Sequence, residues 1–464
     1  MNSADTIAAI ATPNAPGGIG IVRMSGCSAI IIAERIFFQN NPINWSQWNG
    51  YSMHYGTIAD KLSPGNQSFS ETIGESICLV FRSPKSYTGE DVVEFQCHGG
   101  QMALRRVLRL AIAHGARLAD PGEFTRRAFL NGRIDLAEAE AVMRLIQARS
   151  EASARAAAAA LGGTLSRAIA DVRGELIGLA AHISAWVDYP EDDPPELRPE
   201  QISMVLRQAH QGLDALLRKS KAAAPALDGV DTVLLGKPNV GKSTLMNLLA
   251  GFERSIVTEF AGTTRDTVTE AARLGKLPLR LTDTAGIHAA QDPIERLGVE
   301  RSRAAAAGAA LLLLLLDASQ PLTAEDEALL AACDPARTVV LCNKADLGSC
   351  VDAQTLRARF AHVIPFSAVT GMGLEALTEA AEVLLGAGAF SPWEALLSTE
   401  RQVGCAEDAA RSIEEALSAQ EQGYPLDAVA VCVEDAIQAL FSLTGERATE
   451  AVVDEVFAQF CVGK

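Results

Sequence analysis

An eight-residue segment near the middle of the chain constrains the fold more than any other feature. Residues 236–243 match the pattern G-x-x-x-x-G-K-S, which is typical of a phosphate-binding loop. The apolar residues 232–235 suit a buried strand before this loop, and residues 244–249 suit a helix after it. In this setting backbone N–H groups can turn onto an anion, and the helix N-terminus adds its positive dipole. We therefore expect Lys242 to reach the β- and γ-phosphates of a nucleotide and Ser243 to hold Mg²⁺.

Two later segments match the phosphate-sensing parts of a guanine-nucleotide-binding domain. Residues 262–266 lie at the distance of a switch loop, where a threonine can complete the Mg²⁺ shell. A predicted strand over 279–282 leads into residues 283–286. There Asp283 would bind Mg²⁺ through water, and Gly286 could donate its N–H to the γ-phosphate.

The base is expected to be recognised further along the chain. A predicted strand over 338–342 is followed by Asn-Lys-Ala-Asp, in which Asp346 can accept two hydrogen bonds from the ring N–H and amino group of guanine. Adenine lacks this pair of donors, so the motif selects GTP over ATP. A last strand over 363–366 precedes Ser367 and Ala368, which can back the base. Four ordered motifs on alternating strands and helices predict a Ras-like, doubly wound, mostly parallel sheet with its site at the strand carboxyl ends.

The group that orients the attacking water is not evident from these motifs. Ras-type GTPases place a glutamine directly after the segment 283–286, but this chain has Ile287, which cannot hydrogen-bond water. The nearby acidic candidates are Asp292, Glu295 and Glu300, all of which would also suit solvated switch charges. In the phosphate loop, the amide oxygen of Asn239 could hold a monovalent cation beside the phosphates and replace the charge of an arginine finger.

Composition excludes several other kinds of protein. The chain has 464 residues, of which 48% are apolar and 21% charged, so it can build two to four domains with cores of their own. A net charge of −17 argues against tight non-specific nucleic-acid binding, although a local patch could still contact RNA. Nine cysteines without a C-x-x-C pair suggest neither a zinc site nor a disulfide framework. No signal pattern and no apolar run of membrane length occur, so we expect a reduced, cytoplasmic protein with no membrane association.

The segment before the nucleotide domain predicts two regions of different character. Residues 1–131 mix expected strands, such as 19–24 and 76–81, with expected helices, such as 29–38 and 102–114, and so predict an α+β domain. Residues 132–227 are strongly helical and predict three long helices, over 137–161, 165–187 and 202–224.

The closing segment, residues 389–464, predicts two further helices over 393–420 and 426–444. We expect these helices to rejoin the earlier ones in a bundle, which makes residues 228–388 an inserted nucleotide domain.

Two single residues leave alternatives open. His98 precedes two glycines and could be catalytic, but a histidine there more often closes a turn. Cys461 could be a nucleophile, but a lone cysteine is more often a small buried apolar residue.

End to end, the chain resembles the MnmE family of tRNA-modification GTPases, also called TrmE. The resemblance rests on specific motifs at residues 5–13, 87–91, 121–125, 127–132, 262–266 and 460–464. It implies a homodimer held by N-terminal domains that bind a 5-formyltetrahydrofolate-type cofactor. By motif position, the folate contacts would be Arg23, Glu94, Arg133 and Lys464.

For the nucleotide domain, the resemblance implies G domains that dimerise across their switch regions when potassium and GTP are bound. Glu295 would orient the hydrolytic water, which lifts it above the other two acidic candidates. The potassium ligands would be Asn239, Thr258, Phe260 and Thr263, and the Mg²⁺ ligands Ser243 and Thr264. The full set of expected GTP contacts is Asn239, Val240, Gly241, Lys242, Ser243, Thr244, Thr258, Glu259, Phe260, Ala261, Gly262, Thr263, Thr264, Asp283, Thr284, Ala285, Gly286, Asn343, Lys344, Asp346, Ser367 and Ala368.

The same resemblance implies a reaction and a partner. Together with the FAD-dependent protein MnmG (GidA), in a heterotetramer, the family adds an aminomethyl or carboxymethylaminomethyl group at the 5 position of the tRNA wobble uridine. Folate would supply the one-carbon unit, and hydrolysis of GTP to GDP would drive a conformational cycle. Two positions depart from the family: His288 stands where a basic residue is usual, and Arg133 where lysine is common.

The rival interpretation is a regulatory or ribosome-assembly GTPase without modification chemistry, which the nucleotide domain alone would not exclude. The folate-type N-terminal segment and the Cys-Val-Gly-Lys tail favour tRNA modification. A stand-alone methyltransferase that merely carries a GTPase fits less well, because no separate catalytic constellation is visible.

Overall fold

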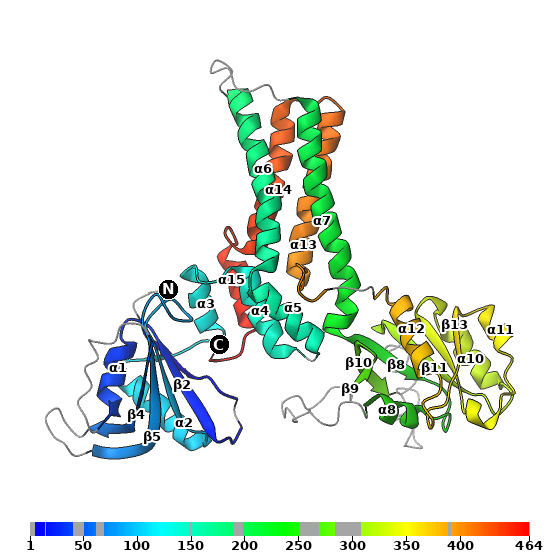
Figure 1. The fold of residues 1–464 in the computed structure, drawn as a ribbon, viewed down its shortest axis with the longest axis horizontal. Coiled ribbons are helices and arrows are strands. Elements are labelled where there is room, and N and C mark those ends of the chain that lie inside the picture. Colours follow the sequence, from blue (N-terminus) through cyan, green and yellow to red (C-terminus); the bar gives the residue numbers. More distant parts are fainter. Residues whose placement is uncertain are drawn as a thin grey trace, which may run out of the picture. The chain divides into compact units, whose positions relative to one another are not determined.

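The computed structural model describes residues 5–13, 15–39, 51–61, 69–148, 150–188, 198–250, 269–283, 308–387 and 391–463 (Figure 1). The chain divides into two compact units. Unit 1 comprises Met1–Met143, Ala160–His210 and Thr399–Lys464, and unit 2 comprises Arg144–Ala159 and Gln211–Ser398. Unit 1 is therefore assembled from stretches of chain on both sides of the nucleotide-binding segment, which is an insertion. The domain boundaries at 131, 227 and 388 stay predictions.

The N-terminal part of unit 1 is built on a seven-stranded sheet in the order β3-β4-β5-β6-β2-β1-β7. Neighbouring strands are antiparallel except β1 and β7, which are parallel. The strands are β1 (Ile7–Ile10), β2 (Ile19–Ser25), β3 (Phe37–Phe38), β4 (Tyr51–Lys61), β5 (Phe69–Phe81), β6 (Val92–His98) and β7 (Arg117–Leu118). Mixed strands and helices confirm the predicted α+β class.

Helices α1 (Ala29–Ile36) and α2 (Gln101–Ala113) share one buried core with this sheet. Val22, Met24, Val80 and Phe95 alternate along their strands and point into that core. The expected helix over 29–38 is two residues too long, because Phe37 and Phe38 pair with β4 as an edge strand. His98 is the last residue of β6 and is exposed.

On the other face of the sheet, several apolar side chains lie exposed. Tyr51, Met53 and Tyr55 on β4 are each more than 60% exposed. They pair across the ladder with Phe81, Leu79 and Ile77, so all six project from the same face. Over β1 this face is covered instead by α3 (Glu123–Leu130), whose Phe124 packs on Ile7 and Ala9.

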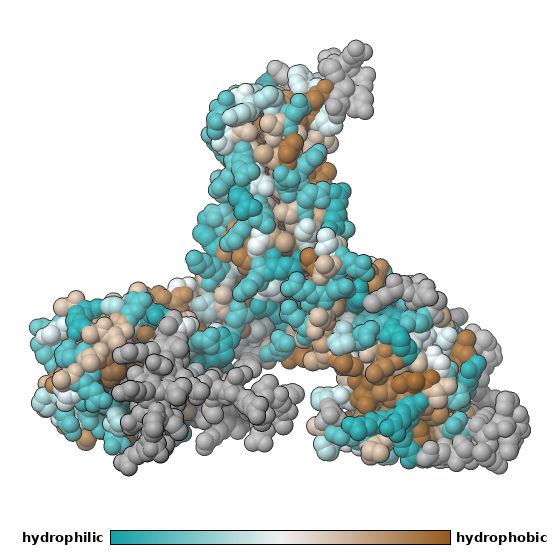
Figure 2. Space-filling model, turned by 180° about the vertical axis from the view of Figure 1, so that it is seen from behind, coloured by the Kyte–Doolittle hydropathy of each residue, from teal (hydrophilic) through white to brown (hydrophobic). Residues whose placement is uncertain are grey.

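The helices of unit 1 pack as the predicted bundle. Its elements are α4 (Leu136–Gln147), α6 (Thr164–Asp188), the start of α7 (Pro199–Asp228), α13 (Glu400–Glu421), α14 (Leu426–Thr444) and α15 (Glu450–Ala458). α14 packs against both α6 and α13, so segments before and after the insertion share one core. On the face of the molecule that Figure 2 shows, hydrophilic side chains cover much of these helices, as expected for amphipathic helices.

Three helix predictions were wrong in their limits. The expected helix 137–161 is two helices, α4 and α5 (Glu151–Leu161), because Ser150 caps α5 by accepting the N–H of Ser153 at 3.1 Å. α13 begins at Glu400 rather than at 393, because Thr399 accepts the N–H of Gln402 at 3.2 Å. α7 continues past 224 through Pro225 to Asp228, although proline cannot donate a helical hydrogen bond, and Ala226 in this last turn is buried.

Unit 2 contains a six-stranded sheet in the order β13-β12-β11-β8-β10-β9, in which only β9 is antiparallel to its neighbour. The strands are β8 (Val230–Leu235), β9 (Thr269–Leu274), β10 (Leu277–Asp283), β11 (Leu311–Asp317), β12 (Thr338–Asn343) and β13 (His362–Pro365). The helices named here are α8 (Lys242–Ala250), α10 (Ala324–Ala332), α11 (Ala353–Arg357) and α12 (Leu374–Leu384). This is the predicted doubly wound, mostly parallel arrangement.

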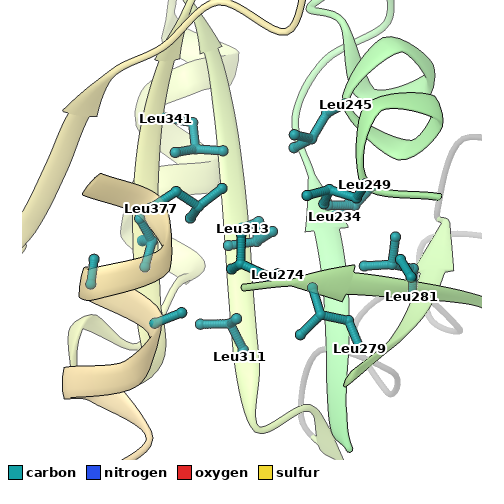
Figure 3. Packing of buried hydrophobic residues seen from close by; sticks show 14 of the residues in the cluster. Leu234, Leu245, Leu249, Leu274, Leu279, Leu281, Leu311, Leu313, Leu341 and Leu377 are labelled. Carbon is teal, nitrogen blue, oxygen red and sulfur yellow. The ribbon is translucent and has the colours of Figure 1, made fainter. Parts of the chain in front are cut away.

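The central strand β11 shows why this sheet is stable. Its six consecutive leucines are buried and alternate between the two faces of the sheet, and Figure 3 shows the core on one of these faces. Leu311, Leu313 and Leu315 face one core, whereas Leu314 and Leu316 face the other. A strand covered on both faces carries an unbroken apolar run, which is typical of a parallel sheet between helices.

Among the described residues, no helix is long and apolar enough to cross a bilayer.

Candidate nucleotide and folate-type sites

The phosphate-binding loop connects β8 to α8 at the carboxyl end of the parallel sheet. Asn239 adopts a left-handed backbone conformation with φ of 63°, and Gly241 has φ of 103°. A Cβ atom at Gly241 would lie 2.3 Å from Nδ2 of Asn343, so only glycine lets the loop approach that strand end. Ser243 and Thr244 are exposed in the first turn of α8, where an anion and its metal would meet the helix N-terminus.

Lys242 is buried and already lies within the curl of the loop. Its Nζ donates to the carbonyl oxygens of Gly236 at 2.5 Å and Lys237 at 2.8 Å. The ammonium group therefore lies inside the loop that is expected to hold the phosphates. This placement fits the predicted contact of Lys242 with the β- and γ-phosphates.

Asn343 joins the phosphate loop to the base-recognition segments. Its Nδ2 donates to the carbonyl of Val240 at 2.7 Å, and its Oδ1 accepts the N–H of Ala368 at 2.9 Å. Asn343 is almost fully buried, so both bonds form away from water. Three motifs that the sequence placed separately therefore meet at one side chain.

Lys344 and Asp346 continue the base-recognition segment beyond β12. Nζ of Lys344 forms an ion pair of 2.6 Å with Oδ2 of Asp317 at the end of β11. Burial opposes the charged form of Asp317, but bonds from Lys344 and Ser319 outweigh it and lower the pKa of this carboxyl group. Asp346 is exposed and available to a base, and Ser367, which follows the last strand β13, is buried.

Several predicted nucleotide contacts fall outside the described residues. β10 ends at Asp283, which pairs with Leu234 immediately before the phosphate loop. The remaining contacts, which lie beyond the described ranges together with the folate contact Lys464, are Thr258, Glu259, Phe260, Ala261, Gly262, Thr263, Thr264, Thr284, Ala285, Gly286 and Glu295.

Two of the expected folate contacts meet on the N-terminal sheet. Arg23 on β2 and Glu94 on β6 are direct cross-strand partners, and Nε of Arg23 donates to Oε1 of Glu94 at 2.7 Å. The guanidinium carbon of Arg23 lies 5.7 Å from the ring centre of Tyr87 and 5.6 Å from that of Phe124. Both rings therefore lie within the distance at which an aromatic face attracts a cation. Arg133 is exposed after α3, beside the loop that contains Gly89, and no bond joins it to this pair in the described part of the chain.

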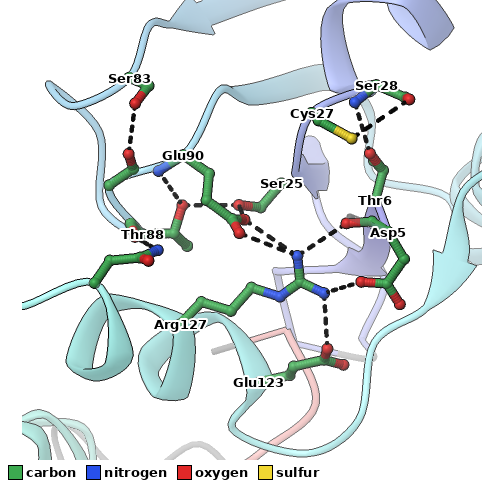
Figure 4. Close-up of polar contacts among 12 residues, drawn as sticks. Asp5, Thr6, Ser25, Cys27, Ser28, Ser83, Thr88, Glu90, Glu123 and Arg127 are labelled. Carbon is green, nitrogen blue, oxygen red and sulfur yellow. Dashed lines mark hydrogen bonds and ion pairs between the residues drawn. The ribbon is translucent and has the colours of Figure 1, made fainter. Parts of the chain in front are cut away.

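Sequence reasoning missed a cluster of charges centred on Arg127 (Figure 4). Its guanidinium donates to Oδ1 of Asp5 at 2.7 Å, to Oε2 of Glu90 at 3.2 Å and to Oε1 of Glu123 at 3.0 Å. Arg127 is only 9% exposed. Burial favours the neutral form of Glu123, but bonds from Arg117, Asp120 and Arg127 overcome it and lower its pKa. The available signal was that the motifs at 5–13, 87–91, 121–125 and 127–132 each carry charged residues.

The C-terminal segment is held against the same domain. The N–H of Gly122 donates to the carbonyl of Cys461 at 3.3 Å, and the rings of Phe457 and Phe460 pack 5.1 Å apart. A Cβ atom at Gly122, whose φ is 68°, would lie 2.8 Å from Cβ of Phe460. Cys461 itself is exposed, so its interpretation as a buried apolar residue was wrong: the buried neighbour at this point is Phe460.

The doubly wound sheet, the phosphate loop at its carboxyl end and the buried Asn343 bridge together define a P-loop GTPase. Comparison with known proteins extends this class to a family. The family model "GTP-binding protein TrmE N-terminus" matches residues 6–133, and "MnmE helical domain" matches residues 136–461.

Relatives that match over nearly the full length of the chain indicate the same family as the two family models. The chain is 39% identical to the tRNA modification GTPase MnmE of Lactobacillus gasseri over 99% of this chain and 98% of that protein. It is 40% identical to that of Geobacillus thermodenitrificans over 100% of both chains, and 42% identical to that of Symbiobacterium thermophilum over 99% of both. The chain belongs to the MnmE family of tRNA modification GTPases, as its motifs predicted. Its enzymatic activity is GTP hydrolysis in tRNA modification.

Proposed function

We propose that this protein is a potassium-activated GTPase that modifies the wobble uridine of tRNA together with an FAD-dependent MnmG partner. One observation carries the proposal. A single chain combines a preorganised nucleotide site, joined by Asn343, with an N-terminal sheet that presents the Arg23–Glu94 pair between two aromatic rings. The product would carry an aminomethyl or carboxymethylaminomethyl group at the 5 position of the uridine. Conversion of GTP to GDP would then drive a conformational cycle of the G domains.

The nucleotide site fits GTP with Mg²⁺. Lys242 lies within the loop curl, Ser243 presents its hydroxyl at the start of α8, and Asp346 is exposed to accept the guanine edge. Bound Mg²⁺ neutralises charge that develops on the β- and γ-phosphate oxygens. Thr264 would complete its ligands, and Thr258, Phe260 and Thr263 would join Asn239 around potassium. Glu295 would orient water by accepting one of its protons in a hydrogen bond.

The Arg23–Glu94 pair supports the folate-type cofactor. A folate presents a ring edge with N–H donors and a tail with carboxylates. Glu94 can accept hydrogen bonds from the ring edge, and the terminal nitrogens of Arg23 can donate to a carboxylate. Tyr87 and Phe124 flank the guanidinium and provide flat apolar surface beside the pair. Arg133 and Lys464 would add positive charge for the tail.

The exposed apolar face of the N-terminal sheet supports the homodimer. Tyr51, Met53 and Tyr55 place large side chains on one face, next to Ile77 and Leu79 of the adjacent strand. A contiguous apolar face of this kind is typical of a protein interface. Two such chains with two MnmG chains would form the heterotetramer that acts on tRNA in the cytoplasm.

The test is the rate of GTP hydrolysis in potassium and in sodium at equal ionic strength, for wild type, Asn239→Ala, Glu295→Ala and the control Asp292→Ala. Potassium should raise the wild-type rate about tenfold or more, because it supplies charge at the transition state. Asn239→Ala should lose that activation, and Glu295→Ala should lose hydrolysis while it still binds GTP. Asp292→Ala should behave as wild type. Equal wild-type rates in both salts would refute potassium activation.

A further inference from the structure

One residue of the phosphate loop forms an ion pair that the proposed function does not use. The side chain of Lys237 leaves the loop and reaches the start of α10, where its Nζ donates to Oδ2 of Asp326 at 2.6 Å and to Oγ1 of Thr323 at 2.8 Å. In the same residue, the carbonyl oxygen accepts the hydrogen bond from Nζ of Lys242. Lys237 is thus held from outside the loop by its side chain, while its main chain holds the phosphate-binding lysine inside.

Asp326 depends on this contact for its charge. Its side chain is 4% exposed, and Lys237 is its ion-pair partner among the described residues. Oδ2 also accepts the N–H and the hydroxyl of Thr323, at 2.9 and 2.8 Å, whereas the buried Oδ1 has no hydrogen-bond partner in the described part of the chain. Burial opposes ionisation, but the bonds from Lys237 and Thr323 outweigh it and lower the pKa of this carboxyl group. A buried carboxylate with one cationic partner holds that partner in place.

We propose that Lys237 is a positioning residue for nucleotide binding and that Asp326 is its anchor. Binding a nucleotide requires the loop to keep one conformation, and a loop that is already tethered loses less conformational freedom when the phosphates arrive. The tether acts one residue after Gly236, at the carbonyl groups on which Lys242 lies. The loop pattern prescribes no residue type at position 237, so this role belongs to the particular pairing of Lys237 with α10.

The test measures nucleotide affinity and stability separately, on the full-length protein. Affinity for a fluorescent GDP analogue and the melting temperature without nucleotide are measured for Lys237→Met, Asp326→Asn, the double variant and Lys237→Arg. Lys219→Met is the matched control, because Lys219 forms a 2.7 Å pair with Glu394 in the same unit, with both side chains about half exposed. The melting temperature measures the cost of leaving the buried Asp326 carboxylate unpaired, and the nucleotide affinity measures the cost of ordering the phosphate loop.

Lys237→Met should weaken nucleotide binding about tenfold, since an untethered loop has to be ordered on binding, and should also lower the melting temperature. In the double variant the unpaired charge is gone, so the melting temperature should recover while the affinity stays low. Lys237→Arg should keep the affinity within about threefold, because it retains the charge and its reach. Lys219→Met should match wild type in both measurements.

Two results would overturn the proposal. Wild-type affinity in Lys237→Met would show that the tether does not prepare the loop. Recovery of affinity together with melting temperature in the double variant would show that Lys237 only neutralises Asp326. Neither result would affect the assignment of the GTP site, because Lys242, Ser243 and Asp346 are unchanged in every variant.

Discussion

The Arg127 cluster offers a direct test of what holds the N-terminal domain together. Substituting Arg127 by methionine keeps the apolar stem and removes the guanidinium, so packing changes little and the charge is lost. Asp5, Glu90 and Glu123 then lose the cation that all three share. Because these residues come from three distant segments, the substitution removes a side chain that bonds all three, although Arg117 still bonds Asp5 and Glu123.

The expected loss of stability follows from how buried each carboxylate is. Removing one partner of a buried ion pair costs about 3–5 kcal/mol. Here the lower end applies, because Glu123 keeps its 2.6 Å bond from Arg117, and the side chains of Asp5 and Glu90 are 37% and 18% exposed to water. A loss of about 3 kcal/mol corresponds to a fall of roughly 6–12 °C in melting temperature for a unit of roughly 250 residues.

Differential scanning calorimetry of full-length Arg127→Met and wild type measures this fall. Arg207→Met is the control in the same unit, since Arg207 pairs with Glu421 at 3.1 Å and both side chains are about 60% exposed. Such a surface pair contributes about 0–1 kcal/mol, so the control should melt within roughly 4 °C of wild type. Equal shifts for the two variants would refute the inference that the Arg127 cluster stabilises the domain more than surface pairs do.

Three further predictions concern the same unit. Gly122→Ala should destabilise the protein by about 1–3 kcal/mol more than Gly423→Ala in calorimetry, because both glycines have φ near 70° but only at Gly122 would the new Cβ meet neighbouring atoms. Iodoacetamide at pH 8 should label exposed Cys461 in the native protein and spare Cys97, whose pKa burial raises to about 11; mass spectrometry of the peptides checks this. Glu123 has a lowered pKa, so its stabilisation is fully present above the unfolded-state pKa of about 4.5 and is lost as pH falls through the lower folded-state pKa; the melting temperature of Glu123→Gln should therefore fall less than that of wild type as the pH is lowered below about 4.5.

The parts of the fold that the sequence predicted are those with local signals. The phosphate loop has fixed glycine spacing between an apolar strand and a helix, and both flanks form as expected. The run of leucines in β11 is long enough for a strand and too short for a membrane helix. In contrast, β9 was missed although residues 275 and 276 form a two-residue Gly-Lys connection between two strands, which is a recognised hairpin signal. The strand β4 was missed because a strand acquires much of its conformation from the neighbours that it pairs with, here β3 and β5.

The sites were predicted less completely, because sequence position does not reveal which partner a charge will take. The sequence places Asn343 at the nucleotide, and the structure adds that its two hydrogen bonds go to Val240 and Ala368. Its side chain therefore joins parts of the site, and the base contacts of Asn343 and Asp346 stay predictions. Each end of the Asn343 amide already makes a hydrogen bond, and the side chain is buried. The carboxylate of Asp346 is exposed, so its oxygens are more accessible to a ligand.

The same reasoning separates Arg127 from Arg23, the arginine that the family resemblance assigns to the folate. Arg127 directs its terminal nitrogens to three carboxylates and a backbone carbonyl, and it is almost fully buried. Arg23 bonds Glu94 through Nε, and among the described residues its terminal nitrogens make no hydrogen bond. A guanidinium whose donors are already satisfied stabilises the fold, whereas one with unused donors beside an aromatic surface can bind an anionic ligand. Arg23 and Glu94 are therefore the pair that we propose for the ligand of this domain, and Arg127 bonds Glu90 and Glu123 in the segments that carry Tyr87 and Phe124.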